Sequence, residues 1–173
     1  MVKIVVACCG SVAAVRVPEL VRDLLRHDFE VECVMSGSAQ EIIHPNVLEW
    51  ASCNKVITRI TGGIEHVRLC GINGEAGLLL VCPATSNTIS KIACGIDDTC
   101  VTTFAATALA SKTKVLLVPA MHQSMYDNPF VRENIVKLAD NGVTVLEPRI
   151  EEGKAKLLGN KDILAAIAAK LDE

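Results

Sequence analysis

Polar side chains follow directly after two apolar runs of the sequence. The first run, residues 78–81, leads into residues 82–88, which contain two threonines, a serine and an asparagine. The second run, residues 115–118, leads into residues 119–126, which contain two methionines and a histidine. Ligands of open α/β sheets bind outside the carboxyl ends of the strands, so we expect these two loops to form one site. Hydroxyl, amide and backbone N–H groups of this kind can bind phosphate oxygens.

Two earlier turns have the same character. Gly10 and Ser11 follow the predicted strand 3–7, and Ser36 and Ser38 follow the predicted strand 30–35. The first turn has one glycine and lacks the G-x-G-x-x-G pattern of dinucleotide-binding proteins, so a single phosphate is the better prediction. Serines at the second turn could bind phosphate oxygens, although capping the next helix is their commoner use.

Strand-like and helix-like segments alternate along the whole chain. Buried apolar runs and helical periodicities occur in turn. The predicted strands are 3–7, 30–35, 78–81, 115–118 and 143–146. The predicted helices are 16–25, 45–50, 86–94, 100–110, 129–138 and 163–171, and residues 147–156 are predicted to be a charged connector. This alternation predicts an α/β fold with a three-layer, doubly wound parallel sheet, and we expect residues 1–173 to form a single domain.

Composition narrows the functional classes. Half of the 173 residues are apolar and only 3% are aromatic, which indicates an aliphatic core. The net charge of −3 gives no electrostatic reason to expect nucleic acid or an anionic membrane as a partner. No apolar stretch is long enough to span a bilayer, and no signal peptide precedes the first strand, so we expect a cytoplasmic protein.

The eight cysteines form no C-x-x-C pair. Closely spaced ligand pairs are typical of zinc and iron–sulfur sites, so no metal site is predicted. Several of these cysteines lie within apolar runs, where a free thiol behaves as a small hydrophobic side chain. We therefore expect most of them to be buried and reduced.

Three titratable residues invite a catalytic interpretation. Asp97 and Asp98 are adjacent in a turn, and adjacent side chains do not converge on one point. We expect them to cap the following helix, where negative charge is favourable. His66 lies in a short mixed stretch before the central strand, and from the residues alone a lone histidine is more often structural than catalytic.

The motifs in order resemble the flavin-dependent cysteine decarboxylases, a family that includes phosphopantothenoylcysteine decarboxylases and lantibiotic peptide decarboxylases. The matching segments run from the first strand nearly to the end of the chain. They are residues 10–14, 34–36, the stretch around His66, 83–88 with 93–98, and 119–121 with 125–129. Five ordered motifs at compatible spacing are specific to this family, whereas any one of them alone is not.

The resemblance implies a Rossmann-like or flavodoxin-like flavoprotein domain that binds FMN without a covalent bond. It also implies a homo-oligomer, a trimer or dodecamer, with sites at subunit contacts. The FMN-binding residues implied by the motifs are Gly10, Ser11, Val12, Ser36, Ser38, Thr85, Ser86, Asn87, Thr88 and Met121. The substrate-binding residues implied are Asn87, Met121, His122 and Met125.

The resemblance places His66 at the position of the active-site histidine of the family, as the acid–base or orienting group. The implied reaction, that of an FMN-dependent carboxy-lyase, begins with oxidation of a cysteine by the flavin. CO2 is then lost from a thioaldehyde-type intermediate as an enethiolate forms. In the phosphopantothenoyl branch the electrons return, and 4′-phosphopantetheine of coenzyme A biosynthesis is released from the small-molecule substrate 4′-phosphopantothenoylcysteine.

Two positions depart from the family pattern. The family has an asparagine after Pro-Ala-Met, which holds the substrate carboxylate, and this chain has His122, whose imidazole can still donate to a carboxylate. The late loop of the phosphopantothenoyl enzymes contains a cysteine, whereas residues 151–156 contain none. Both departures resemble archaeal-type members. Lys154 and Lys156 of this loop are either solvated charges or contacts for a substrate phosphate.

Three alternatives share this fold. A flavin-based electron carrier or reductase, similar to dihydropterin reductase, would not need His66. A non-catalytic regulatory subunit would bind FMN and a protein partner, as phosphatase-inhibiting relatives do. A flavin prenyltransferase is disfavoured by the Pro-Ala-Met-x-x-x-Met loop at residues 119–125.

Overall fold

The computed structural model describes residues 1–173 and contains a five-stranded parallel sheet with the strand order β2-β1-β3-β4-β6. The strands of this sheet are β1 Lys3–Cys8, β2 Glu30–Met35, β3 Ala76–Ala84, β4 Lys114–Pro119 and β6 Thr144–Val145. β3 is central and pairs with β1 on one side and β4 on the other. The strand order is that of flavodoxin-like doubly wound folds, so the predicted fold class is confirmed.

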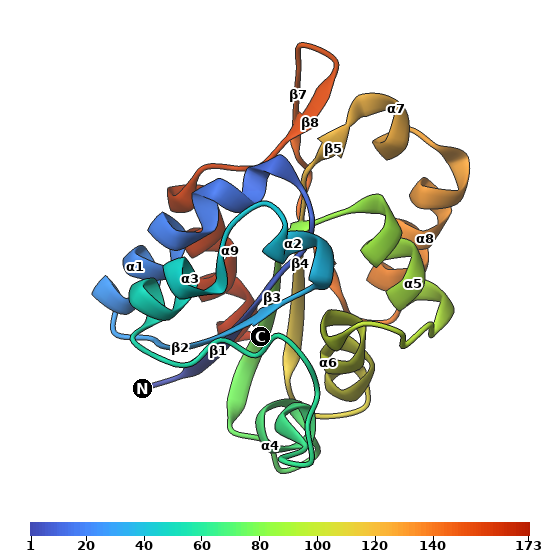
Figure 1. Cartoon of the computed structure of the whole chain (residues 1–173). Helices are drawn as coiled ribbons and strands as arrows, with labels where there is room; N and C mark the ends of the chain where they lie inside the picture. Colours follow the sequence, from blue (N-terminus) through green and yellow to red (C-terminus); the bar gives the residue numbers. More distant parts are fainter.

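Helices cover both faces of the sheet (Figure 1). The helices are α1 Val17–Arg26, α2 Gly37–Gln40, α3 Pro45–Ser52, α4 Glu65–Cys70, α5 Ser86–Cys94, α6 Cys100–Leu109, α7 Gln123–Tyr126, α8 Pro129–Asp140 and α9 Asn160–Asp172. A short 3-10 helix, η1 Val12–Arg16, precedes α1. One core cluster joins α1, α3 and α9 to the sheet, and the other joins α4, α5, α6 and α8 to its opposite face.

Alternate residues of each strand enter opposite cores. In β1, Ile4 and Val6 pack in the cluster with α1, whereas Val5 and Ala7 pack in the cluster with α6. All four are fully buried, which explains why the strand is a continuous apolar run rather than an alternating one. Phe104 of α6 is among the largest fully buried side chains, in an otherwise aliphatic core.

The predicted strands and most predicted helices occur within a few residues of their expected bounds. The prediction for residues 147–156 was wrong, because this connector contains a β-hairpin. Its strands are β7 Arg149–Glu151 and β8 Lys154–Lys156, and β8 also pairs antiparallel with β5 Met121–His122. Glu152 and Gly153 have φ angles of 52° and 69°, which a two-residue hairpin turn requires. The hairpin projects from the carboxyl end of the main sheet (Figure 1).

Five of the eight cysteines are buried, and all eight are free thiols. Burial raises the pKa of Cys9 to about 11 and the pKa values of Cys33, Cys70 and Cys82 to about 12. These thiols therefore remain protonated near neutral pH and act as small apolar side chains, as predicted. No cluster of three or more His, Cys, Asp or Glu side chains is arranged to hold a metal ion. None of the helices combines the length and apolar composition that crossing a bilayer requires.

Candidate active site

A cavity of about 560 Å³ lies at the carboxyl ends of the central strands. It brings together all ten residues predicted to bind FMN, together with Met125. Its lining consists of Gly10, Ser11, Val12, Ser36, Gly37, Ser38, Thr85, Ser86, Asn87, Thr88, Lys91, Thr99, Ala120, Met121 and Met125. Four loops that are far apart in sequence therefore meet in one place.

Helix caps fix the hydroxyl groups of this cavity. Ser11, Ser36 and Thr85 are the N-cap residues of η1, α2 and α5, and each side chain accepts a backbone N–H bond of 3.2 or 3.3 Å. The Thr85 hydroxyl also donates to Thr88 Oγ1 at 3.1 Å. Because a hydroxyl has one donor and two acceptor positions, capping leaves Ser11 and Ser36 able to donate to a ligand.

Gly10 allows two of these loops to approach each other. A Cβ atom at this position would lie 2.4 Å from Ser38 Cβ and 3.1 Å from the Ser38 carbonyl carbon. Only a residue without a side chain can therefore occupy position 10 while Ser38 keeps its place. At the neighbouring Gly37, a Cβ would meet no atom within 4 Å.

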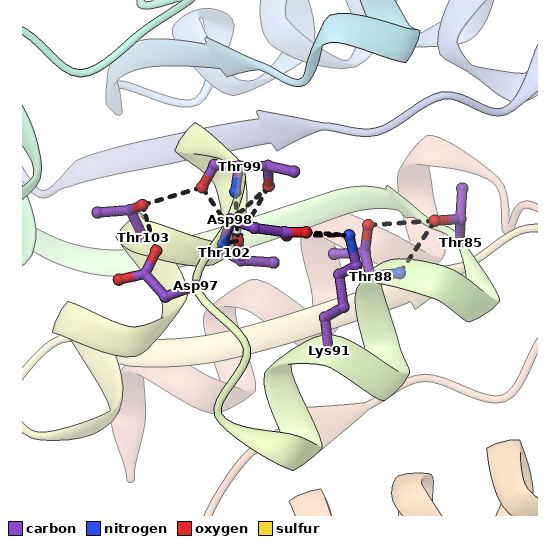
Figure 2. Close-up of polar contacts among 8 residues, drawn as sticks. All are labelled: Thr85, Thr88, Lys91, Asp97, Asp98, Thr99, Thr102 and Thr103. Atoms are coloured by element: carbon purple, nitrogen blue, oxygen red, sulfur yellow. Dashed lines mark hydrogen bonds and ion pairs between the residues drawn. The ribbon is translucent and has the colours of Figure 1, made fainter.

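Lys91 is the only charged residue in the lining of this cavity, and sequence reasoning missed it. Its ammonium group donates to both carboxylate oxygens of Asp98, at 2.9 and 2.7 Å. Figure 2 shows this pair between α5 and the turn before α6. Since Lys91 lies one helical turn after Asn87 on α5, the i,i+4 spacing is the signal that could have revealed it.

The prediction that Asp97 and Asp98 cap α6 was wrong. Thr99 is the N-cap, and it forms a capping box with Thr102 (Figure 2). Asp97 instead accepts a hydrogen bond from the hydroxyl of Thr103. Thr99 also lines the cavity. The sequence did not lead us to predict Thr99, Gly37 or Ala120 as lining residues.

A second cavity, of about 410 Å³, adjoins the first. The two share Ser11, Val12, Ala120 and Met121 in their linings. The second cavity alone is lined by Ala13, Arg16, His122, Lys154, Ala155, Lys156 and Leu157. Met121 thus lies where both cavities can be reached, while His122 faces only the second.

His66 lies outside both cavities. It belongs to α4, which is at the opposite end of the main sheet from β5 and α7 (Figure 1). Its ring is 6.4 Å from the Phe104 ring, edge to face, and its Nδ1 atom is buried without a hydrogen-bond partner. One copy of the chain therefore does not bring His66 to the predicted cofactor site.

The first cavity fits a phosphate-bearing cofactor such as FMN. Its lining offers seven Ser or Thr hydroxyl groups, one ammonium group and no carboxylate. The amino ends of α5 and α6 both border it, and their free backbone N–H groups favour anions. The close approach of Gly10 to Ser38, which only a glycine permits, leaves room for a ligand between these two loops.

Comparison with known proteins places the chain in a family. The family model described as Flavoprotein matches residues 1–172, so the chain belongs to the flavoprotein family. The chain is 55% identical over 170 residues to the coenzyme A biosynthesis bifunctional protein CoaBC of Thermococcus kodakarensis, covering 98% of this chain and 42% of that protein. The expected resemblance to flavin-containing cysteine decarboxylases is confirmed.

Two further similarities cover nearly the whole of both chains. A probable phosphopantothenoylcysteine decarboxylase of Streptococcus mutans is 31% identical over 175 residues, covering 98% of this chain and 93% of that protein. The crystal structure of SpaF, described as an FMN-dependent cysteine decarboxylase, superposes with a TM-score of 0.83 at 29% identity, covering 99% of this chain and 95% of SpaF. The chain spans about two fifths of the length of the bifunctional relatives.

Proposed function

We propose that this chain is an FMN-dependent carboxy-lyase that converts 4′-phosphopantothenoylcysteine to 4′-phosphopantetheine in coenzyme A biosynthesis. The observation that carries this proposal is the pair of adjoining cavities, which share Met121: a hydroxyl-lined one that fits FMN, and a second one that would take the substrate. Similarity to a probable phosphopantothenoylcysteine decarboxylase over nearly the full length of both chains supports it. We propose that residues 1–173 act as one FMN-binding domain.

The residues of the first cavity would hold the cofactor. Backbone and hydroxyl groups from Gly10 to Val12, with Ser36, Ser38 and residues 85–88, would bind and orient FMN. When bound, FMN supplies the electron chemistry, which is oxidation of the cysteine end before CO2 leaves and return of the electrons afterwards. Asn87, Met121 and Met125 would position the substrate, and the His122 imidazole would donate to its carboxylate.

A second copy of the chain would supply His66. We propose a homo-oligomer, a trimer or dodecamer, in which α4 of one subunit lies against the cavity of the next. Ile64, Val67 and Ile72 around this helix are large apolar residues with exposed fractions of 54%, 45% and 72%. Clustered exposed apolar side chains are typical of interaction surfaces. In such an assembly the unpartnered Nδ1 of His66 could find a partner, and the ring could move or hold a proton at the substrate.

Anaerobic incubation of the FMN-loaded protein with 4′-phosphopantothenoylcysteine, followed by mass spectrometry, tests the proposal. Loss of CO2 alone is the expected result. Loss of CO2 plus two hydrogens, with bleached flavin, would mean an oxidative decarboxylase that stops at the enethiol. No reaction would contradict the proposed function.

One observation favours a second candidate function. The late loop, residues 149–156, contains no cysteine that could take part in the return of electrons. An FMN electron-transfer protein on the same fold would need no such group. It would show reversible flavin reduction without loss of CO2 in the same experiment. For either function we propose a cytoplasmic location, in keeping with a core rich in reduced thiols.

A further inference from the structure

The β5–β8 strand pair places a histidine and a lysine directly opposite each other. His122 pairs with Lys154 in the antiparallel register, and both line the second cavity. Directly opposed residues of an antiparallel pair project from the same face, with Cβ atoms about 4.5–5.5 Å apart. A lysine ammonium group and an imidazole on the same face of a strand pair can both donate hydrogen bonds to an anion placed between them.

Hydrogen bonds fix which nitrogen of His122 is a donor. The backbone N–H of Ser124 donates to Nδ1 at 3.2 Å, and the Ser124 hydroxyl lies 2.8 Å from the same atom. Nδ1 is therefore an acceptor, and in the neutral ring the proton resides on Nε2. Nε2 faces the hairpin turn, since a Cβ built on Gly153 would lie 4.0 Å from it. His122 thus presents an N–H donor beside Lys154.

Of the two lysines of the hairpin, Lys154 is the one that has no carboxylate partner. The two acidic side chains of the hairpin, Glu151 and Glu152, are both paired with Lys156, at 3.1 and 2.8 Å. No carboxylate lies within 4 Å of the Lys154 ammonium group, and none lines the second cavity. The Arg16 guanidinium, which also lines it, donates to the carbonyl oxygens of Leu157 and Leu158.

We propose that Lys154 is a further substrate-binding residue, whose ammonium group acts beside the Nε2–H group of His122 on the substrate carboxylate. This proposal rests on the proposed function, because it names the substrate group that the second cavity takes. The carboxylate is two carbons away from the cysteine sulfur, whereas the phosphate is at the far end of the pantothenoyl chain. Since Met121, next to His122, also lines the cofactor cavity, a group bound here lies beside the reacting end.

Kinetics of the FMN-loaded enzyme test the role of Lys154. Removing one charge-assisted hydrogen bond weakens binding on the order of 10-fold, so Lys154→Met should raise KM for 4′-phosphopantothenoylcysteine about 10-fold and change kcat less. Lys154→Arg, which keeps the charge, should restore most of the affinity. Lys161→Met is the matched control, because Lys161 is exposed on α9, has no ion pair and lines neither cavity. An unchanged KM in Lys154→Met would overturn the proposal.

The affinity for the product shows whether Lys154 binds the carboxylate or the phosphate of the substrate. 4′-Phosphopantetheine keeps the phosphate but lacks the carboxylate, so its affinity should be equal in the wild type and Lys154→Met. An equal loss of affinity for substrate and product would mean that Lys154 binds the phosphate, and the carboxylate assignment would be wrong. If the wild-type enzyme released no CO2, the proposed function would fail, and the difference in affinity between substrate and product would still test the anion site by calorimetry.

Discussion

The two ends of the main sheet carry different kinds of side chain. At the carboxyl end, hydroxyl groups and a glycine contact line a cavity in which Lys91 is the only charged residue. At the amino end, Lys3 pairs with Glu30 and Glu75, and Arg68 of α4 pairs with Glu75 and Glu32. The carboxyl end brings the ten residues predicted to bind FMN together within one chain. The amino end holds α4 in place, with His66 half-buried beside Phe104 and outside both cavities.

Of the changes predicted here, replacement of His66 should have the largest effect, and it should alter catalysis without altering FMN binding. General acid–base groups contribute about 10²- to 10⁴-fold to rate, so His66→Asn should lower CO2 release by that factor. FMN content should not change, since His66 lies outside the cofactor cavity. The measurements are flavin absorbance per chain and CO2 release under single-turnover conditions. Full activity in His66→Asn would remove this residue from the mechanism.

Hybrid oligomers show whether His66 acts on another subunit. Coexpression of His66→Asn with a variant that cannot bind FMN should restore activity, because some subunit contacts then combine an intact cavity with an intact histidine. Hybrids as inactive as the two parents would show that the histidine does not act across a subunit contact.

A side chain at position 10 should weaken FMN binding at the carboxyl end of the sheet and leave the amino end unchanged. Gly10→Val would bring Cβ to within 3.1 Å of the Ser38 backbone, and overpacking of this kind costs about 1–3 kcal/mol. The expected result is FMN affinity weakened about 10- to 100-fold, measured by fluorescence titration. Gly37→Ala is the control, because its Cβ would meet nothing within 4 Å. Equal FMN affinity in both variants would contradict the close-approach argument.

Sequence reasoning located the carboxyl end well because its determinants are local. Each cavity loop follows a buried apolar strand and begins a helix, and turn residues such as Gly10, Ser36 and Thr85 mark these junctions in the sequence. The parallel order of the strands then brings the loops together. Lys91 was not predicted as a cavity residue because it lies within helix α5, and a lysine within a helix usually faces solvent.

The amino end and the hairpin could not be predicted as readily. The distance between His66 and the cavity depends on how α4 packs against α6, a tertiary contact that no local pattern encodes. The hairpin had a signal, since Glu152-Gly153 lies between segments in which Ile150 and Ala155 alternate with charged residues, but the high charge of the segment favoured a connector. The opposition of His122 and Lys154 follows from that hairpin and was therefore missed with it.

Added negative charge in the cavity should have a smaller effect than a lost contact. Asn87 is exposed at the start of α5 and lines the cofactor cavity. Asn87→Asp would repel an anionic ligand and should weaken FMN or substrate on the order of 10-fold at low salt, with a smaller loss at high salt. Asn46→Asp adds the same charge at the start of α3, outside both cavities, and should change nothing. Unchanged spectra and kinetics in Asn87→Asp would remove this residue from the site.

The smallest expected effect concerns stability at the amino end. The Lys3 ammonium group, hydrogen-bonded to the Glu75 carboxylate, is the main cause that lowers the pKa of Glu75, and Arg68 adds to it. Because the folded-state pKa is below the unfolded value of about 4.3, the stabilisation is fully present above that pH. It is lost as the pH falls through the folded-state pKa. Glu75→Gln should therefore be less stable than the wild type at pH 7, by less than about 1 kcal/mol for so exposed a pair.

Urea unfolding of both proteins between pH 7 and pH 3 measures this difference, which should vanish at the acidic end. Glu133→Gln is the control, since Glu133 is exposed and has no ion pair within 4 Å, and its stability difference should not depend on pH in this way. A deficit in Glu75→Gln that persists at pH 3 would mean that the carboxylate acts through packing. FMN affinity should be the same in Glu75→Gln and the wild type, because the ion pairs that hold α4 lie at the end of the sheet remote from the cofactor cavity.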